Sequence, residues 1–218
     1  DALSIMLAVD GVPVLVDPGT YLYHSGGAWR DWFRGTAAHN TLSLDGADQS
    51  LISGPFNWSH KAKAQLDHFH GGDRWTIKAH HDGYQKSHGV LHQRSIERTE
   101  TGYRITDALL GRDDSQEAQV VFQLAPGLSC ELEGDKVIVS SGPDRLVALR
   151  FEGQGVEVFR GGDHGGGWVS PSFGLKVPAN RIVWTGPVGS TGRSVLIEIA
   201  ESARSSGRSS SELVGMEP

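Results

Sequence analysis

Hydrophobic and polar residues alternate with a period of two along much of the chain. Alternation sends successive side chains to opposite faces of a strand, so each such segment predicts a strand with one buried face. Eight segments show it: residues 12–17, 41–45, 62–70, 74–80, 117–124, 135–140, 145–151 and 194–200. The stretches between them, such as DG, GG and TGR, are typical of tight turns. The pattern therefore predicts a meander of antiparallel strands.

Helical periodicity is scarce by comparison. No window longer than ten residues has convincing 3.6-residue periodicity, although residues 28–35 (AWRDWFRG) are compatible with one or two helical turns. About a dozen strands in a chain of this size are more than one open sheet holds without curling or splitting. We therefore predict an all-β fold, a two-layer antiparallel β-sandwich with little helix.

The chain has 218 residues and a mass of 23.5 kDa, which fits one large all-β domain. We assign residues 1–201 to that domain. Residues 202–218 replace hydrophobic alternation with Ser and Arg, which predicts a flexible tail or linker. The first residues lack an initiator Met, a basic region and a cleavage site, so we interpret the chain as a fragment.

The net charge and the hydropathy of the chain argue against two classes of binding partner, nucleic acids and the membrane interior. Twenty basic and 26 acidic side chains give a formal net charge of -6, and no long basic run offsets it. Binding to nucleic acid is therefore not expected, and a polyanionic ligand would need a local basic patch. No apolar run approaches the roughly 20 residues of a membrane helix, so no membrane span is predicted.

Residues 16–46 hold the densest group of chemically active side chains, in a loop longer than a hairpin needs: Asp17, Tyr21, Tyr23, His24, Arg30, Arg34, His39 and Asn40. Long loops in compact domains are usually functional. Asp17 and His39 would converge on one divalent ion if their strands are neighbours, but zinc usually takes at least three protein ligands. The alternative is that Asp17 caps the Pro-Gly turn and His39 binds backbone, and spacing alone favours this alternative.

The same loop offers candidates for binding an anion. Arg30 and Arg34 are four residues apart, so on a helix they would share one face and form a clamp for carboxylate or sulfate. A salt bridge to Asp31 or to a neighbouring loop is an equal alternative. Asn40 is most simply a support for the His39 loop through hydrogen bonds to backbone.

The remaining candidates are two tyrosines and two pairs of residues, each pair on one face of a strand. Tyr21 and Tyr23 have the same parity, and we expect at least one to pack in the core and Tyr23 to be exposed. His68 and His70 share one strand face without a third partner in view, and solvent exposure is the commoner outcome. A second same-face pair, His92 with Arg94, is interpreted as an internal hydrogen-bonded pair or as part of a cleft.

Two motifs carry a resemblance to a known family. DPGTY is followed by R-x-x-x-R-x-T-x-x-HNT and then by LDG-x-DQ, and residues 82–111 carry H-x-R and a later Asp: His92, Arg94 and Asp107. These motifs resemble the C-terminal β-sheet region of the heparinase II/III-like polysaccharide lyases. The resemblance spans roughly residues 1–125.

The resemblance implies a fold and a metal site. Complete enzymes of this family pair an N-terminal α/α toroid with a C-terminal two-layer sandwich, supersandwich-like, and the saccharide lies in the cleft between them. Some members hold zinc through a His at an H-x-D-x-x-S motif, the Asp of a D-x-G turn and the His of an HN pair. Residues 1–4 (DALS) resemble the tail of the first motif, and Asp17 and His39 match the other two. The third ligand is expected upstream of residue 1.

The resemblance also implies a reaction, β-elimination at the C5 of a uronic acid in an anionic polysaccharide. That chemistry needs a group to neutralise the carboxylate, a base and an acid. We assign catalysis to Tyr23 and His39, substrate binding to Arg30, Arg34 and Asn40, and metal binding to Asp17 and His39. The toroid of the same parent chain would supply the other groups, in a bacterial periplasmic or secreted enzyme. The alternative is a non-catalytic carbohydrate-binding or structural β-sandwich module.

Overall fold

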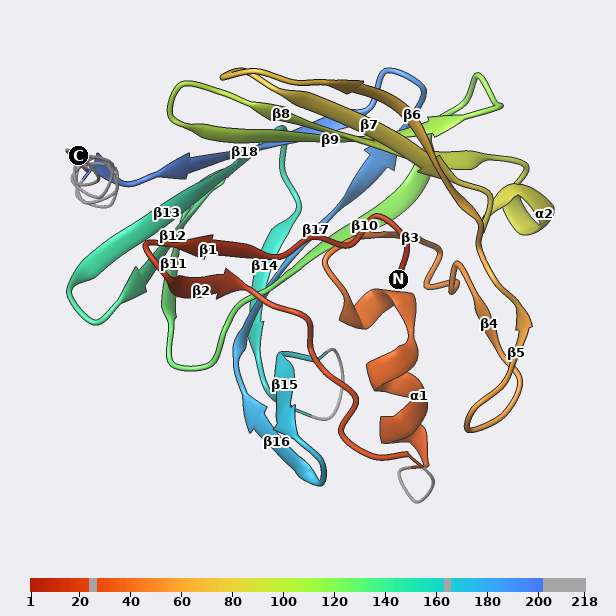
Figure 1. Cartoon of the computed structure of the whole chain (residues 1–218), viewed down its shortest axis with the longest axis horizontal. Helices are drawn as coiled ribbons and strands as arrows, with labels where there is room; N and C mark the ends of the chain where they lie inside the picture. The colour runs from red at the N-terminus through yellow and green to blue at the C-terminus, as the bar shows by residue number, and fades with distance from the viewer. Residues whose placement is uncertain (24–26, 163–165, 202–218) are drawn as a thin grey trace, which may run out of the picture.

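The computed structural model describes residues 1–23, 27–162 and 166–201 of the chain. Its largest sheet has eight antiparallel strands and forms the upper layer in Figure 1. In sheet order these strands are β11 (Ser129–Glu133), β12 (Lys136–Ser141), β13 (Asp144–Phe151), β18 (Arg193–Ile199), β9 (Gly102–Leu110), β8 (Leu91–Arg98), β7 (Thr76–His81) and β6 (Ala64–His70).

A four-stranded antiparallel sheet forms the second layer. Its order is β14 (Val156–Arg160), β17 (Asn180–Val188), β10 (Gln116–Gln123) and β3 (Leu42–Leu44). Three further strand pairs flank the layers: β1 (Leu7–Val9) with β2 (Val12–Leu15), β4 (Leu51–Ile52) with β5 (Trp58–His60), and β15 (Trp168–Ser172) with β16 (Leu175–Pro178). The described helices are short: α1 (Ala28–Arg34), the 3₁₀ turn η1 (Thr36–Ala38) and α2 (Gln85–His88).

The core lies between the two large sheets. On β10, Ala118, Val120 and Phe122 alternate toward it, as a half-buried strand requires. The Phe122 ring meets the ring of Phe151, from β13 in the other layer, at a centroid distance of 5.9 Å. The prediction of a two-layer antiparallel β-sandwich with little helix is confirmed.

All eight segments with alternating hydrophobicity are strands in the structure, but other strands escaped the pattern. Strand β17 is buried on both faces for most of its length, so its sequence does not alternate. On β8 the alternation is inverted, because the fully buried positions are His92 and Arg94. Polar residues that point inward hide a strand from a search for hydrophobic alternation.

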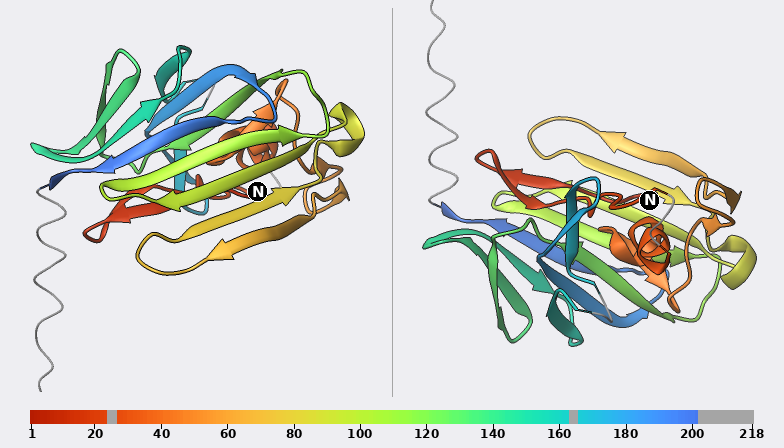
Figure 2. Two further views of the ribbon diagram at one scale, coloured as in Figure 1. Left: turned by 90° about the horizontal axis from the view of Figure 1, so that it is seen from above. Right: turned by 90° about the horizontal axis from the view of Figure 1, so that it is seen from below.

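The chain between β2 and β3 leaves the sandwich and forms α1 beneath it, next to the β15–β16 pair (Figures 1 and 2). Phe33 is buried there, and the Lys176 ammonium of β16 lies 3.9 Å from the centre of the Trp29 ring and 3.6 Å from that of Trp168. The helical turns predicted at residues 28–35 are confirmed. His24 and the predicted tail, residues 202–218, lie outside the described residues.

None of the described helices combines the length and the hydropathy that crossing a bilayer would require.

Candidate metal centre and its surroundings

The first side chain of the site comes from the turn that follows β2. The backbone N–H of Gly19 donates to Asp17 Oδ1 over 2.8 Å, so the carboxylate caps its own turn. Gly19 has a φ of +83°, and a side chain there would collide with the backbone oxygen of Ser170. The Ser170 N–H in turn donates to the Pro18 carbonyl over 2.7 Å. Glycine therefore lets the D-P-G turn lie against β15 and fixes the position of Asp17.

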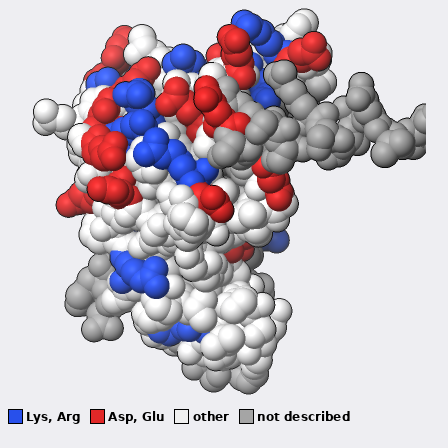
Figure 3. All heavy atoms as spheres, turned by 90° about the vertical axis from the view of Figure 1, so that its left-hand side faces the viewer, with Lys and Arg blue, Asp and Glu red and all other residues white. Residues whose placement is uncertain are grey.

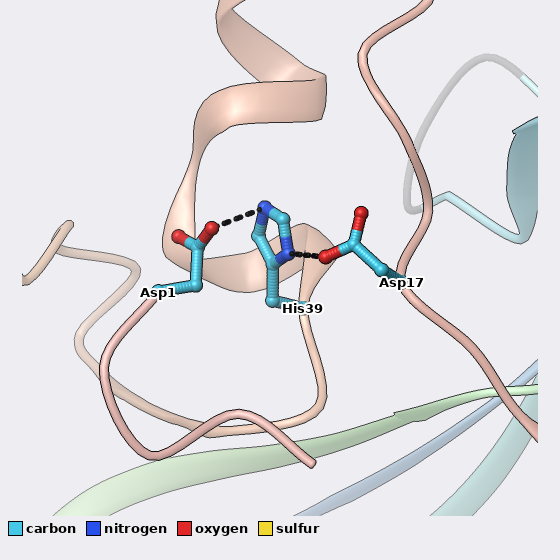
Figure 4. A group of neighbouring side chains, drawn as sticks. All are labelled: Asp1, Asp17 and His39. Atoms are coloured by element: carbon cyan, nitrogen blue, oxygen red, sulfur yellow. Dashed lines mark hydrogen bonds and ion pairs between the residues drawn. The ribbon is translucent and has the colours of Figure 1, made fainter. Parts of the chain in front are cut away.

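The second side chain, His39, follows η1 and is only 4% exposed. Its Nδ1 lies 3.0 Å from Asp17 Oδ2, and its Nε2 lies 3.0 Å from Asp1 Oδ2 (Figure 4). The Phe33 carbonyl is a further partner of Nε2, at 3.2 Å. The imidazole is thus held edge-on between two carboxylates.

Asp1, Asp17 and His39 form the candidate metal centre. One potential ligand atom from each lies within 4.8 Å of the others. Over residues 1–23, 27–162 and 166–201, no other group of three or more His, Cys, Asp or Glu side chains is so placed. The two strand histidines, His68 and His70, are exposed and lie outside any such group.

The charge state of Asp17 suits a cation-binding role. Partial burial acts to raise the pKa of this carboxyl group, but the hydrogen bonds from His39 and the Gly19 N–H, and the charge of His39, outweigh it. The pKa therefore lies below its ordinary value, and Asp17 is an anion at neutral pH.

Asn40, next to His39, joins the chain segments of the centre. Its side chain is completely buried. The amide Nδ2 donates to the carbonyls of Ile5 at 2.7 Å and Val16 at 3.0 Å, and Oδ1 accepts the Gln123 N–H at 2.6 Å. The amide makes three backbone hydrogen bonds, which fits the interpretation that Asn40 supports the His39 loop.

Arg94 lies beneath the centre, on β8, and is almost fully buried. Its Nε and Nη2 donate to the two carboxylate oxygens of Asp107 at 2.8 and 2.9 Å, the bidentate geometry typical of strong ion pairs. Its Nη1 donates to the carbonyls of Leu3 at 2.7 Å and Asn40 at 2.6 Å. Coulombic attraction to Arg94 and a hydrogen bond from His92 outweigh burial and hold the pKa of Asp107 far below its ordinary value.

Two buried histidines extend this ion pair into a chain of hydrogen bonds. The Gly83 N–H donates to Nδ1 of His81 at 3.1 Å, so a neutral His81 carries its proton on Nε2 and donates to Nδ1 of His92, 3.0 Å away. His92 then donates from Nε2 to Asp107 at 2.6 Å. Burial, with the charges of His92 and Arg94, lowers the pKa of His81 to about 3, and burial lowers that of His92. We call His81, His92, Arg94 and Asp107 the buried polar network.

The two arginines of α1 share one face, as their spacing predicted, and both bind the loop between β4 and β5. Arg34 donates to the carbonyls of Gly54 at 2.8 Å, Pro55 at 3.1 Å and Asn57 at 3.2 Å, and is buried. Arg30, which is less buried, donates to the Pro55 carbonyl from Nε and Nη2. Both arginines therefore contact a neighbouring loop, but through hydrogen bonds to its carbonyls rather than through the salt bridge that the alternative expected.

Tyr23 lies at the far end of α1, in a stack of exposed rings. It lies between Phe56, with a centroid distance of 6.4 Å, and Phe173, with a distance of 5.6 Å, and both pairs are nearly parallel. The three side chains are 48%, 64% and 62% exposed, and the Arg30 guanidinium lies 5.6 Å from the Tyr23 ring. Tyr21, in contrast, packs on Trp29 and Phe33. We call Tyr23, Phe56 and Phe173 the aromatic end.

The structure brings the predicted ligands Asp17 and His39 together, whereas the other predicted site residues make different contacts. Asn40 and Arg34 bind backbone, while Tyr23 and Arg30 reach the surface at the aromatic end. The sequence prediction left Asp1 out of the ligand set. Its expectation of a ligand upstream of residue 1 stays a prediction. A signal for Asp1 is present in the sequence, because the resemblance of DALS to the metal-binding motif includes this Asp.

The donor set fits a divalent cation. Two carboxylates and one imidazole are ligands that zinc and manganese accept, and three protein ligands are the number found in catalytic zinc sites. An imidazole binds an ion through one ring nitrogen and commonly keeps the other on a carboxylate, and both ring nitrogens of His39 already face carboxylates.

Comparisons with known proteins agree with the fold. The family model "Heparinase II/III-like, C-terminal" matches residues 1–207. The heparan sulfate lyase HepC from Pedobacter heparinus is similar in structure, with a TM-score of 0.69 and 17% sequence identity over 91% of this chain and 30% of that chain. A crystal structure of heparinase III gives a TM-score of 0.69 and 16% identity over 90% of this chain and 29% of that chain. The chain thus spans about a third of the length of these solved relatives.

The search of curated proteins finds no match. The family model covers nearly the whole chain, and the lyase structures share the fold. The chain therefore belongs to the heparinase II/III-like family, in the part that forms the C-terminal domain.

Proposed function

We propose that this chain is the β-sandwich domain of a polysaccharide lyase that cleaves uronic-acid-containing glycans by β-elimination. The observation that carries the proposal is the convergence of Asp1, Asp17 and His39 within 4.8 Å in a domain of this family. Structural relatives are named as the heparan sulfate lyase HepC and as heparinase III. A bacterial enzyme of this kind would act in the periplasm or outside the cell.

Asp1, Asp17 and His39 would hold a divalent cation, zinc being the metal that the family resemblance implies. A bound cation would supply positive charge to stabilise the carboxylate and the carbanion-like transition state. His39 acts as a ligand held in a fixed orientation, since both ring nitrogens face carboxylates. Its predicted catalytic role would then be exercised through the ion rather than by free proton transfer.

The remaining predicted residues would either contact the sugar or hold the backbone of the site in place. Arg30 and Tyr23 are accessible and lie together, so they would contact an anionic sugar, with Tyr23 as the candidate proton-transfer group. Arg34 and Asn40 would act by fixing backbone, since their hydrogen bonds go to carbonyl and N–H groups. An α/α toroid of the same parent chain would complete the cleft.

The test uses the full-length parent enzyme and follows the ultraviolet absorbance of the unsaturated uronate product on heparan sulfate, alginate and hyaluronan. Wild-type enzyme should release the product from at least one of these glycans. His39→Ala should abolish release and Tyr23→Phe should lower kcat, whereas His80→Ala, a histidine paired with Asp67 away from the centre, should not. Wild-type activity in His39→Ala would refute the proposed role of the centre.

A non-catalytic carbohydrate-binding module is the second candidate, favoured by the aromatic end. Exposed parallel rings are a common way to stack on sugar faces. Figure 3, which views the left-hand side of Figure 1, shows acidic and basic residues intermixed over the upper part of the molecule, while the lower part is largely uncharged. Glycan binding by a full-length parent that releases no unsaturated product from any glycan would favour this candidate.

A further inference from the structure

The candidate metal centre is assembled from three separate stretches of chain. Asp1 comes from the first residues, Asp17 from the turn after β2, and His39 from the end of η1. None of these stretches belongs to a long strand or helix. Repulsion between two carboxylates also opposes the arrangement before a cation binds. Something other than local secondary structure must hold the three ligands in place.

Hydrogen bonds from two buried side chains join these stretches. Arg94 Nη1 donates to both Leu3 and Asn40, so one guanidinium nitrogen ties the Asp1 segment to the residue that follows His39. The Asn40 amide donates to Ile5 and Val16, so it ties the same first segment to the residue before Asp17. Three of the four backbone carbonyls bound in this way, those of Leu3, Val16 and Asn40, belong to residues within two positions of a metal ligand. The fourth, that of Ile5, lies four positions from Asp1.

Four of the five N–H donors of the guanidinium have acceptors. Two bind the carbonyls of Leu3 and Asn40, and two bind Asp107 bidentately at another edge of the group. His92 donates to the same carboxylate, and His81 donates to His92 in turn. A buried arginine held in this way has little rotamer freedom, and its planar fork fixes the direction of each hydrogen bond. Four polar side chains buried together also cost desolvation energy, which ordinary apolar packing would avoid.

We infer that Arg94 is a positioning residue for the metal centre: supported by Asp107, His92 and His81, it clamps the Asp1 and His39 segments so that the three ligands are preorganised for one divalent cation. The inference rests on the proposed function, because it assigns the clamp a purpose only if the centre binds a cation. It adds a set of residues that lie 42 or more positions from any ligand in the sequence to a site made of Asp1, Asp17 and His39.

The test measures zinc affinity of the chain by competition with a chromophoric chelator. Arg94→Met/Asp107→Asn removes the clamp without leaving a buried unpaired charge and keeps an oxygen acceptor for His92. Supporting residues of metal ligands change affinity by about 10- to 100-fold, and a loss of that size is expected here. Arg94→Lys keeps the charge but cannot bind the carboxylate bidentately and both carbonyls together, so it should restore affinity only in part.

A matched control separates positioning from general destabilisation. Leu149→Ala opens a cavity on β13, three strands away from β8 in the sheet order. This variant should lower the melting temperature and leave zinc affinity within about twofold of wild type. Hydrogen exchange of the metal-free chain provides the second readout. Exchange should increase in peptides covering residues 1–9 and 39–44 in the clamp variant, and not in Leu149→Ala.

The possible results are distinguishable. Weaker zinc binding together with faster exchange in those two peptides supports the inference. Wild-type affinity in Arg94→Met/Asp107→Asn overturns the inference and leaves the proposed metal centre intact. Equal losses of affinity in the clamp variant and in Leu149→Ala also overturn it. Failure of the wild-type chain to bind zinc or manganese would refute the metal centre itself, and the positioning role with it.

Discussion

The buried polar network and the aromatic end both depart from the usual distribution of residues, in which polar side chains face solvent and apolar side chains are buried. The network places an arginine, an aspartate and two histidines inside the sandwich, whereas the aromatic end leaves Tyr23, Phe56 and Phe173 on the surface. Buried polar groups that are fully hydrogen-bonded fix one geometry, while exposed rings provide area for an external partner. On the proposed function, the buried polar network would position the metal centre and the aromatic end would contact the glycan.

The two regions should therefore differ in what substitutions cost. Changes in the network should mainly affect the free energy of unfolding and the metal centre. Changes at the aromatic end should leave the free energy of unfolding nearly unchanged and weaken glycan binding. Substitutions in each region, compared by unfolding and by binding, measure that difference.

Arg94→Met should have the largest effect on stability. It leaves Asp107 as a buried carboxylate without its cation, and breaking a buried pair in this way costs about 3–5 kcal/mol of unfolding free energy. Urea unfolding at pH 7 measures the loss. Arg94→Met/Asp107→Asn should be more stable than the single variant, because no uncompensated charge remains. A single variant as stable as wild type would show that the ion pair is not needed for folding.

Acid should destabilise the folded chain through the buried histidines. The pKa of His81 is about 3 in the folded protein, against an ordinary value of 6.5. Between these values the unfolded chain binds more protons than the folded chain, so stability is full above pH 6.5 and falls as the pH drops. Each such histidine contributes a slope of about 1.4 kcal/mol per pH unit.

Urea unfolding at several pH values between 7 and 4.5 measures this slope. His81→Gln removes one titrating group and should flatten the curve, while His92, whose pKa burial also lowers, keeps part of it. Asp107 does not interfere in this window, because its depressed pKa affects stability only below its ordinary value near 3.8. Identical slopes for wild type and His81→Gln would mean that His81 is not held neutral.

The two arginines of α1 provide a matched pair with an intermediate effect. Arg34→Ala removes donors from three buried or half-buried backbone interactions and should cost about 1–3 kcal/mol. Arg30→Ala removes exposed hydrogen bonds and should cost less than about 1 kcal/mol. Thermal unfolding compares them. Equal costs would contradict the division into a supporting and an accessible arginine.

Phe173→Ala at the aromatic end should have the smallest effect on stability. The ring is mostly exposed and stacks on Tyr23 alone among the described rings, so its loss should cost no more than about 0.5 kcal/mol of unfolding free energy. Retention on an affinity gel loaded with heparan sulfate should nevertheless fall in the full-length parent. Unchanged retention would show that the aromatic end does not contact that glycan.

The contrast between apolar and polar inward positions also explains how much of the fold the sequence could predict. Hydrophobic alternation identified strands such as β10 and β13, whose inner faces are apolar, and thereby the fold class. Strand β8 lacks this alternation, because its inward positions are His92 and Arg94, and the sequence indicated it only through that same-face pair. Pairing these residues with Asp107 required the register of β8 on β9, where Arg94 lies opposite Asp107. Register depends on contacts across the whole sheet.

The sequence predicted the ligands Asp17 and His39 of the candidate site, but neither Asp1 nor the aromatic end. The turn at Asp17 and the His39 motif are local sequence features, and the structure places their side chains 3.0 Å apart. Asp1 was overlooked because its closeness to His39 depends on ties between distant segments, including those of Arg94 and Asn40. The exposed stack of Tyr23 with Phe56 and Phe173 likewise joins three loops that no spacing rule relates.

Calorimetric titration of the metal-stripped chain with zinc measures whether Asp1, Asp17 and His39 bind a cation. We expect wild type to bind one ion per chain and His39→Ala to bind it at least about tenfold more weakly. His80→Ala, which breaks the surface pair with Asp67, should bind as wild type does. Equal zinc affinity in wild type and His39→Ala would contradict the claim that Asp1, Asp17 and His39 form the metal centre.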